Sequence, residues 1–468
     1  MRSALLFVAA AMLAAGAGAP AGEEPFTIAR HYTAADRERD RYVYVPFDVA
    51  EGTTELRIKY EYDRAGGQNT IDLGVFEPGS LELHTTAMRG YSGGSKSEVT
   101  IGCESSRGYR AGPLPAGRWH VMFGLYQVAA GGVDVRLTIV PARGAPCSTG
   151  YGAGPGFGSS GPPRWWSGAL HVHTLHSDGA LTPIELLERV AAAGLDFVTI
   201  TDHNTTTYVR EILRHGRDIP ARVHWIVGEE ITTPAGHANA WGLQGQRWVD
   251  FRVRPHEKRI GELVDAAHRQ GALFSINHPA GECAGCSWEH EVPDGVDAIE
   301  VWNGRRGPQD RAVAMWERLL RDGRRVTAVG ASDWHRPPDP IDGANVRVFV
   351  HAHTQAGILD GIKAGRVIVM RGAADATPSF TVRSGSRSAT VGETLTIADG
   401  PGAIEIEAPG LPGGRAVVVL NATRIPVALD AAGKARLEHA LAPGYVRLET
   451  YDASGEMVAF TNPVYLVK

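Results

Sequence analysis

A run of glycine and proline between residues 148 and 163 divides this chain of 468 residues into parts with different sequence periods. The run reads Ser-Thr-Gly-Tyr-Gly-Ala-Gly-Pro-Gly and, after Phe157, Gly-Ser-Ser-Gly-Pro-Pro. Such a density of glycine and proline cannot form a packed element. We therefore predict that residues 148–164 are a linker at a domain boundary.

The segments at the two ends of the chain alternate apolar and polar residues. Residues 25–147 do so in short runs, such as 133–137, which are separated by turns that contain glycine. The same pattern returns in residues 377–468, for example at 403–407. Alternation with glycine-rich turns is typical of an antiparallel β-sandwich. We predict one sandwich in each segment, and nothing in the first one looks catalytic.

Residues 165–372 have a different period, because short apolar strands alternate there with amphipathic helices. The first helix is expected to begin at Pro183 with Thr182 as its cap and to stop at Gly194. Repeated β-α units imply a parallel sheet, and about seven of them suggest a closed barrel. The predicted fold is therefore multidomain α/β plus β, with a (β/α)7 TIM-like barrel flanked by the two β-sandwiches. The strands are expected at 169–173, 197–200, 225–227, 273–276, 298–301, 326–329 and 346–349, and the later helices at about 257–270, 308–322 and 355–364.

The first 21 residues are typical of a secretory signal peptide. Arg2 supplies the positive charge, residues 4–15 are apolar and small, and an Ala-x-Ala cleavage pattern fits near Ala17, Ala19 or Ala21. The apolar run is too short to span ~30 Å of hydrocarbon. We expect a secreted or periplasmic protein with no membrane span in the mature chain.

The four cysteines are consistent with export. Cys103 and Cys147 could pair at the edges of the first sandwich. Cys283-x-x-Cys286 could be half a zinc site, a redox motif or a local disulfide. No second C-x-x-C exists to complete a four-cysteine zinc site, and a loop disulfide is favoured. The net charge of -5 gives no electrostatic reason to expect nucleic acid as a partner.

Histidines and carboxylates recur at the ends of the predicted strands. His171 and His173 are two apart on a strand, so both side chains point to one face. The other clusters follow later strands, at the face where α/β barrels carry their active sites. Imidazole and carboxylate suit Zn²⁺, Mn²⁺ and Fe, and the set exceeds the needs of one four-coordinate ion. We expect two or three divalent ions with a bridging carboxylate, held by His171, His173, Asp178, His203, Glu230, His237, His278, Asp333 and His335. His176 and the other histidines of this region are off the pattern and are expected to be surface or packing residues.

These motifs resemble the PHP (polymerase and histidinol phosphatase) family over residues 165–372. The resemblance depends on five motifs that agree in order and spacing. Stretches at 232–239, 301–304 and 332–335, and the tail at 460–465, are more similar to a branch that includes carbaryl-type carbamate hydrolases. The motifs are His171-Val172-His173-Thr174 with Ser177-Asp178-Gly179, Thr201-Asp202-His203, Glu230, His278 and Asp333-x-His335.

The resemblance implies a distorted seven-stranded barrel with up to three metals. Only one of Glu229 and Glu230 can face inward on a strand, and the family spacing favours Glu230. Asn239 is a rival of His237 as a ligand. By position, the implied metal groups are His171, His173, Glu230 and Asp333; Glu230, His237 and His278; and Asp178, His203 and His335.

The chemistry expected from this set is hydrolysis. No Ser-His-Asp or Cys-His pattern is evident in the sequence, so a metal-bound hydroxide is the simplest nucleophile. Asp333, or His278 by an outer-sphere route, is the candidate for shuttling the proton. Asn303, Arg305 and Arg306 follow a strand end and are candidates for substrate binding, although a solvated loop is the favoured interpretation of the two arginines.

Three functions remain open from the sequence. A small-molecule phosphoester is the leading substrate, as most of the family suggests, and a carbamate or carboxyl ester is the rival that the closer branch suggests. A non-enzymatic protein is the third possibility, in which the sandwiches bind a glycan or polymer and the metals only stabilise the barrel. The complete ligand set argues against this last reading, because a scaffold has no need for a multimetal site.

Overall fold

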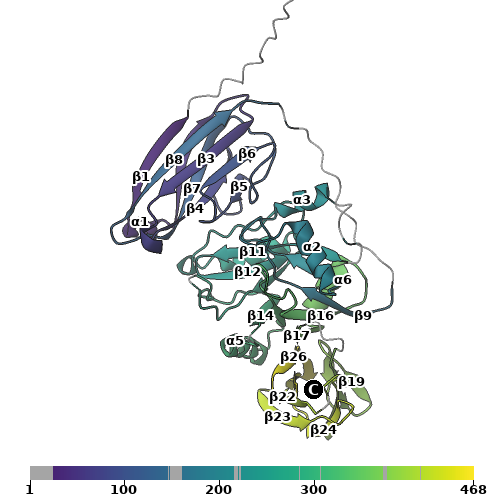
Figure 1. Cartoon of the computed structure of the whole chain (residues 1–468). Coiled ribbons are helices and arrows are strands. Elements are labelled where there is room, and N and C mark those ends of the chain that lie inside the picture. The colour runs from purple at the N-terminus through teal and green to yellow at the C-terminus, as the bar shows by residue number, and fades with distance from the viewer. Residues whose placement is uncertain are drawn as a thin grey trace, which may run out of the picture.

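Three regions rich in β-strands follow one another along the chain in the computed structural model (Figure 1). The structure describes residues 25–145, 147, 161–215, 220, 223–283, 285–305, 307–372, 377–411 and 413–468. The expected signal peptide, most of the expected linker and Arg306 lie outside these residues.

The N-terminal region consists of two antiparallel four-stranded sheets that pack face to face. Alternation explains this packing, since Ile58 and Leu137 from one sheet and Leu73 and Val121 from the other are buried in one core. The first sheet has the order β1 (Phe26–Tyr32), β8 (Val133–Ala142), β3 (Glu55–Tyr62) and β6 (Glu98–Gly102). The second has the order β2 (Tyr42–Val49), β7 (Gly117–Gln127), β4 (Thr70–Phe76) and β5 (Met88–Tyr91), and the short helices of this region are α1 (Ala34–Arg39) and η1 (Ala65–Gly67).

The middle region is built on a mixed sheet. The pairs β9–β10, β10–β11, β13–β14 and β14–β15 are parallel, as expected from the β-α repeats. The pairs of β12 with β11 and β13, and of β16 with β9 and β17, are antiparallel. In sheet order, the strands are β15 (Thr327–Ala331), β14 (Ala298–Asn303), β13 (Leu273–Ile276), β12 (Gly236–Trp241), β11 (His224–Thr233), β10 (Phe197–Ile200), β9 (Arg164–Ala169), β16 (Ala344–Val350) and β17 (Val367–Arg371).

The expectation of a parallel sheet was wrong at two strands. β16 was predicted but pairs antiparallel with β9, and β12, which the sequence analysis did not predict, pairs antiparallel with both of its neighbours. Thr233 pairs with Gly236, so only Pro234 and Ala235 connect β11 to β12 in a tight hairpin. Gly236 has a φ of 124°, and a side chain there would meet the backbone of Trp288, which explains the glycine. The strand pairing also does not close into a ring, because β15 lies against β16 and β17 without pairing with either of them.

The helices of the middle region form where the sequence predicts them. Thr182 and Glu185 form a capping box at the start of α2 (Pro183–Ala192). The predicted later helices are present as α4 (Ile260–His268), α5 (Asp310–Arg321) and α6 (Gln355–Lys363). The sequence analysis missed α3 (Tyr208–Arg214) and the short η2 (Pro255–Glu257).

The C-terminal region shares a sheet with the middle region. Strand β17 pairs with β26, and the same sheet continues through β25, β22 and β23. A second sheet of four strands packs on it, with Val382 and Ile404 from one sheet and Val418 and Leu448 from the other in a common core. The strands are β18 (Ser379–Ser384), β19 (Arg387–Ala389), β20 (Thr394–Thr396), β21 (Pro401–Glu407), β22 (Arg415–Leu420), β23 (Thr423–Ala428), β24 (Lys434–Ala440), β25 (Gly444–Tyr451), β26 (Met457–Thr461) and β27 (Val464–Val467).

Both expected disulfides are present, between Cys103 and Cys147 and between Cys283 and Cys286. Within the part of the chain that the structure describes, every helix is too short or too polar to cross a membrane.

Candidate metal centre

The predicted ligands come together at one end of the middle sheet. His171 and His173 directly follow β9 rather than lie within a strand, and the bridge between Val172 and Trp334 holds them beside the end of β15. Asp178 follows in the same segment after β9, and the others come from the ends of β10, β13 and β15, from inside β11 and from β12. All nine predicted ligands lie in one cluster, namely His171, His173, Asp178, His203, Glu230, His237, His278, Asp333 and His335.

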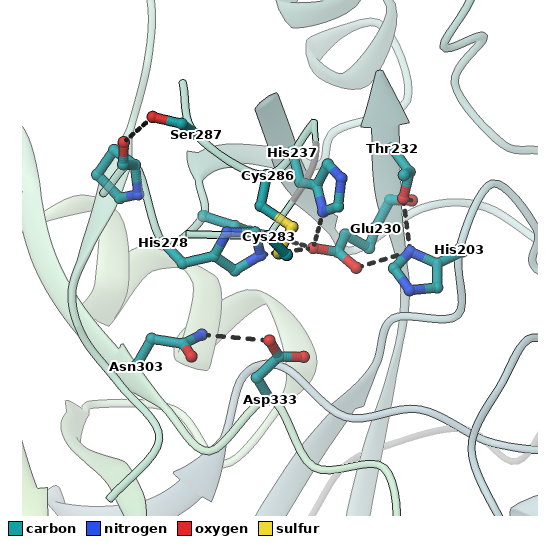
Figure 2. The surroundings of a disulfide bond; sticks show 12 residues. His203, Glu230, Thr232, His237, His278, Cys283, Cys286, Ser287, Asn303 and Asp333 are labelled. Carbon is teal, nitrogen blue, oxygen red and sulfur yellow. Dashed lines mark hydrogen bonds and ion pairs between the residues drawn. A yellow bond between two sulfur atoms is a disulfide. The ribbon is translucent and has the colours of Figure 1, made fainter. Parts of the chain in front are cut away.

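Glu230 lies at the centre of this cluster (Figure 2). Its Oε1 is 3.1 Å from His237 Nδ1 and 3.1 Å from His278 Nε2. The same oxygen is 3.3 Å from His171 Nε2, while Oε2 is 2.8 Å from His203 Nδ1. One carboxylate therefore faces four imidazoles, which is the position that a bridging ligand requires.

Two further carboxylates extend the cluster on either side of His173. Asp333 Oδ1 is 3.2 Å from His171 Nε2 and 3.1 Å from His173 Nε2. Asp178 Oδ1 is 3.3 Å from His335 Nε2 and 3.6 Å from His203 Nε2. Asp178, His203 and His335 therefore form a group of their own, which His173 joins.

The spacing of these atoms fits metal ions. Ligand bonds of about 2.1 Å in a tetrahedron place the ligand atoms about 3.4 Å from one another. The separations between His171 Nε2, Glu230 Oε1 and Asp333 Oδ1 have this size, at 3.2 and 3.3 Å. Four sets of three or four such atoms lie within 4.8 Å of one another. The cluster therefore offers several overlapping sets of ligand atoms.

Metal binding needs neutral imidazole and ionised carboxylate, and the six histidines of the cluster differ in this respect. Burial lowers the pKa of His173 and His237, whereas the nearby carboxylates outweigh burial and raise the pKa of His171, His203, His278 and His335. Burial, together with the neighbouring His335 and His203, lowers the pKa of His173 to about 4. Burial would raise the pKa of Glu230, but the surrounding histidines hold it well below its usual range. His173 is therefore neutral and Glu230 is charged at neutral pH.

Glu300 is a functional residue that the sequence analysis missed. Its Oε1 is 2.8 Å from His171 Nδ1, and its Oε2 accepts hydrogen bonds from the backbone of His278 (2.8 Å) and from Asn303 Nδ2 (3.1 Å). A carboxylate on the far nitrogen of a ligand histidine fixes its tautomer and ring orientation. The signal was present in the sequence as one acid inside the otherwise apolar strand Ala298–Val301.

The choice between the two glutamates of β11 follows from alternation. Glu229 points to the opposite face from Glu230, is fully buried, and accepts a hydrogen bond of 2.6 Å from the backbone of Val249. Burial raises the pKa of Glu229 well above its usual range. Glu229 therefore belongs to the packing of the sheet and Glu230 to the cluster, as the sequence analysis favoured.

The backbone is strained at three residues that closely follow strands of the middle sheet. Asn204, His278 and Asp333 have φ values of 52°, 23° and 51° and follow β10, β13 and β15. Positive φ in residues other than glycine is rare and concentrates at functional sites. The fold maintains these three conformations side by side at one end of the sheet.

The cluster opens into a cavity of about 690 Å³. Asn303, a predicted substrate-binding residue, lines it. Arg305 does not, because its guanidinium is exposed and lies beside the Pro338 carbonyl and Asp339. Arg311, which was not predicted, lines the cavity at the start of α5. Arg306 lies outside the described residues.

The second disulfide forms part of the cavity wall. Cys283 and Cys286 both line the cavity, opposite Asn303 and beside His278 (Figure 2). The Gly285 carbonyl accepts a hydrogen bond of 2.8 Å from Gly236, which ties this loop to the β11–β12 hairpin.

Comparison with known proteins gives partial similarities. No protein-family model matches the chain. A stretch of 124 residues is 29% identical to the 3',5'-nucleoside bisphosphate phosphatase of Chromobacterium violaceum, covering 25% of this chain and 40% of that protein. The chain thus spans less than half the length of this curated relative.

Solved structures of two bacterial proteins show a distant likeness. A two-domain protein from Bacteroides vulgatus that contains a PHP-like metal-dependent phosphoesterase is 17% identical, with a TM-score of 0.37, over 69% of this chain and 100% of that chain. A metal-dependent phosphoesterase from Bifidobacterium adolescentis is 18% identical, with a TM-score of 0.28, over 38% of this chain and 92% of that chain.

Proposed function

We propose that this protein is a metal-dependent phosphoesterase of the PHP type that acts on a small-molecule ester. The observation that carries the proposal is the arrangement around Glu230, in which one buried carboxylate faces four histidines and two further carboxylates extend the set. The local sequence match to a phosphatase supports the choice of a phosphoester. Bound divalent ions would lower the pKa of water and stabilise charge on the substrate oxygen.

The predicted ligands would hold up to three ions. His171, His173, Glu230 and Asp333 would hold one ion, Glu230, His237 and His278 a second, and Asp178, His203 and His335 a third. Zinc, manganese and iron all suit these ligands.

Asp333 is the better placed of the two candidates for moving a proton. Its Oδ1 faces His171 and His173, whereas its Oδ2 is 3.5 Å from Asn303 Nδ2, at the cavity. Oδ2 is therefore the atom that can accept a proton and return it to the leaving group. His278 directs its Nε2 to Glu230 and its backbone to Glu300, so its proposed contribution lies within the ligand set.

Positive charge for an anionic substrate comes from Arg311. This residue lies in the first turn of α5, whose free backbone N–H groups also favour an anion. A phosphate group seated between the cluster and α5 would meet both.

We also propose that the protein works outside the cytoplasm. The N-terminal sequence supports export, and the two disulfides are of the kind that persists in oxidising compartments.

The adjacent glutamates of β11 provide a matched test. Glu230→Gln removes the central carboxylate, and we expect kcat/KM for phosphate esters to fall at least about 100-fold, because metal assistance contributes several kcal/mol. Bound metal per chain should fall as well. Glu229→Gln changes an equally buried neighbour that points away from the cluster, and it should retain activity within about twofold.

The substrate panel separates the ester classes. It contains p-nitrophenyl phosphate, a nucleoside 3',5'-bisphosphate, 1-naphthyl N-methylcarbamate and p-nitrophenyl acetate, each assayed with manganese or zinc. Release of phosphate that Glu230→Gln abolishes supports the proposal. Hydrolysis of the carbamate alone would replace it with the rival ester class. A wild-type protein that binds no metal would refute both.

A further inference from the structure

A loop of the N-terminal sandwich, residues 103–110, lies directly against the metal-centre region. Arg107 forms two hydrogen bonds to Glu211 of α3, from Nε to Oε2 at 2.9 Å and from Nη2 to Oε1 at 3.0 Å. The backbone N–H of Gly108 donates to Thr207 Oγ1 at 3.1 Å. A planar guanidinium on a carboxylate is a geometrically specific contact, so the loop is held in one position.

His176 contacts the same two residues, Glu211 and Thr207, from the side of the metal centre. Its Nε2 is 3.0 Å from Glu211 Oε2, and its Nδ1 is 2.9 Å from Thr207 Oγ1. The imidazole is buried, whereas the sequence analysis predicted only a surface or packing residue. The hydrogen bond from His176, together with Arg107, lowers the pKa of Glu211 to about 2. Glu211 therefore stays charged and links both partners across the physiological range.

The connection continues from His176 toward Asp178. The backbone N–H of His176 donates to Thr174 Oγ1 at 3.1 Å, and Thr174 Oγ1 donates to Asp202 Oδ2 at 2.6 Å. Ser177 Oγ donates to the other oxygen of Asp202, also at 2.6 Å. Residues 174–177, which directly precede Asp178, are thus fixed at several points.

The fit between the two loops is close. Gly108 has a φ of 92°, and a Cβ added there would lie 2.9 Å from the Tyr91 carbonyl oxygen and 3.2 Å from that of His176. The sandwich therefore approaches the backbone of the metal-centre loop as closely as only glycine permits.

Some other contacts between these two regions lie away from the ligands. Arg252 donates to the Leu81 carbonyl at 2.8 Å and to the Glu82 carbonyl at 3.0 Å, and so joins the sandwich to the segment after β12. Contacts of this kind are sufficient to dock the sandwich. The series from Arg107 through Glu211 and His176 is different, because it ends at the loop that presents Asp178.

We propose that the N-terminal sandwich is a working part of the metal centre, in which Arg107 acts through Glu211 and His176 as a positioning residue for the metal group of Asp178, His203 and His335. This inference depends on the proposed function, since it assumes that the group binds a divalent ion. It gives the N-terminal sandwich a role that the sequence analysis did not predict.

The test compares metal uptake in full-length variants. Each protein is titrated with Mn²⁺, bound metal per chain is measured after gel filtration, and amide hydrogen exchange is followed in residues 174–178. For Arg107→Ala, we expect the most weakly bound ion to lose about tenfold in affinity, the effect typical of losing an outer partner of a ligand, with the other ions unchanged. Exchange in residues 174–178 should become faster. Arg107→Lys should recover only part of the affinity, because an ammonium cannot form the paired contact.

Arg118→Ala is the matched control. Arg118 also pairs with a carboxylate in the same sandwich, with Nε 2.6 Å and Nη2 3.2 Å from Asp48, but this pair is exposed on β2 and β7. It should leave metal affinity and exchange unchanged. If Arg107→Ala does not fold, Glu211→Gln carries the test, because it keeps the shape of the side chain and removes its charge.

The outcomes separate the two proposals. Equal metal affinity and equal exchange in wild type, Arg107→Ala and Glu211→Gln would overturn the positioning role. Equal loss in the Arg118→Ala control would overturn it too, because the effect would then be general. A wild-type chain that takes up no Mn²⁺ or Zn²⁺ would instead refute the proposed function itself.

Discussion

The two β-sandwiches join the middle region in different ways. The N-terminal sandwich completes both of its sheets from its own strands and contacts the middle region through side chains. The C-terminal sandwich instead continues the central sheet, through the backbone ladder between β17 and β26. A shared ladder makes two regions fold as one, whereas side-chain contacts between finished sheets allow each to unfold separately.

Asn462 makes a buried side-chain contact at the C-terminal junction. It is fully buried just after β26, and its amide exchanges two hydrogen bonds of 2.7 Å with the backbone N–H and C=O of Ala328 in β15. Its Nδ2 also donates to the Val367 carbonyl at 3.0 Å. One side chain thus takes the place of a strand partner at the outer edge of β15.

The N-terminal junction combines apolar and charged contacts, since Phe76, Met88 and Met122 of the sandwich are buried in one cluster with Phe251 of the middle region. Besides Arg107, Arg210 of α3 donates to the Cys103 carbonyl at 2.9 Å and to Glu104 at 3.1 Å. Arg214 adds a second contact to Glu104. Exposed ion pairs of this kind contribute little each and are weakened by salt.

The comparison predicts the largest effect for Asn462→Ala. The change leaves the N–H and C=O of Ala328 buried without these partners, and each such group costs about 1–3 kcal/mol. We expect the free energy of unfolding of the joined middle and C-terminal regions to fall by about 3 kcal/mol or more, as measured by urea denaturation. Ser454→Ala, in the exposed turn before β26, should change it by less than about 0.5 kcal/mol.

If the C-terminal sheets of Asn462→Ala unfolded while β15 and β17 stayed protected from hydrogen exchange, this view of the junction would be contradicted. The two regions would then be independent units despite their shared ladder.

Asp72→Asn tests whether the N-terminal sandwich unfolds on its own. Asp72 is buried and accepts a hydrogen bond of 2.7 Å from Tyr91, and burial raises its pKa to about 6. A raised carboxyl pKa favours folding at pH values below the unfolded pKa of about 3.9, and this contribution is lost as pH rises toward 6. At pH 7.5 the charged form therefore destabilises the sandwich, by about 2–3 kcal/mol for a shift of this size.

We expect Asp72→Asn to remove this penalty. The thermal transition of the sandwich should rise relative to wild type at pH 7.5, the gain should vanish near pH 4, and the transition of the other two regions should stay in place. Calorimetry at both pH values measures this. A gain that is equal at the two pH values would show that Asp72 is not the group responsible, and a shift of every transition would show that the sandwich does not unfold separately.

The sequence was most informative where local patterns decide structure. The capping box of Thr182 and Glu185 and the alternation that separates Glu229 from Glu230 are local properties, and the structure shows both. The cluster could be predicted because strand ends of a parallel sheet meet at one edge, whatever the details of the connections.

Long-range pairing could not be predicted in the same way. Nothing in the residues of β26 indicates that their partner is β17, and Asn462 in the tail gives no sign that it pairs with Ala328 over 100 residues earlier. The hairpin that makes β12 antiparallel depends on two residues, Pro234 and Ala235. His176 was set aside because its partners, Glu211 and Thr207, become neighbours only in the folded protein.

Arg210→Ala gives the smallest effect and the most direct test of the N-terminal junction. Arg210 is mostly buried and bonded to a carbonyl and a carboxylate of the sandwich, so we expect a loss of about 1 kcal/mol in the coupling between the sandwich and the middle region. The loss should be larger at about 0.05 M than at about 0.5 M salt, because the higher salt concentration already screens the pair to Glu104 in wild type. Hydrogen exchange in α3 and in residues 103–110 measures it, with Lys434→Ala, which breaks an exposed pair to Glu407 in the C-terminal region, as the control. If Arg210→Ala instead destabilised the middle region as strongly as Asn462→Ala does, both sandwiches would belong to one folding unit. A shared sheet would then stabilise the junction no more than side-chain contacts do.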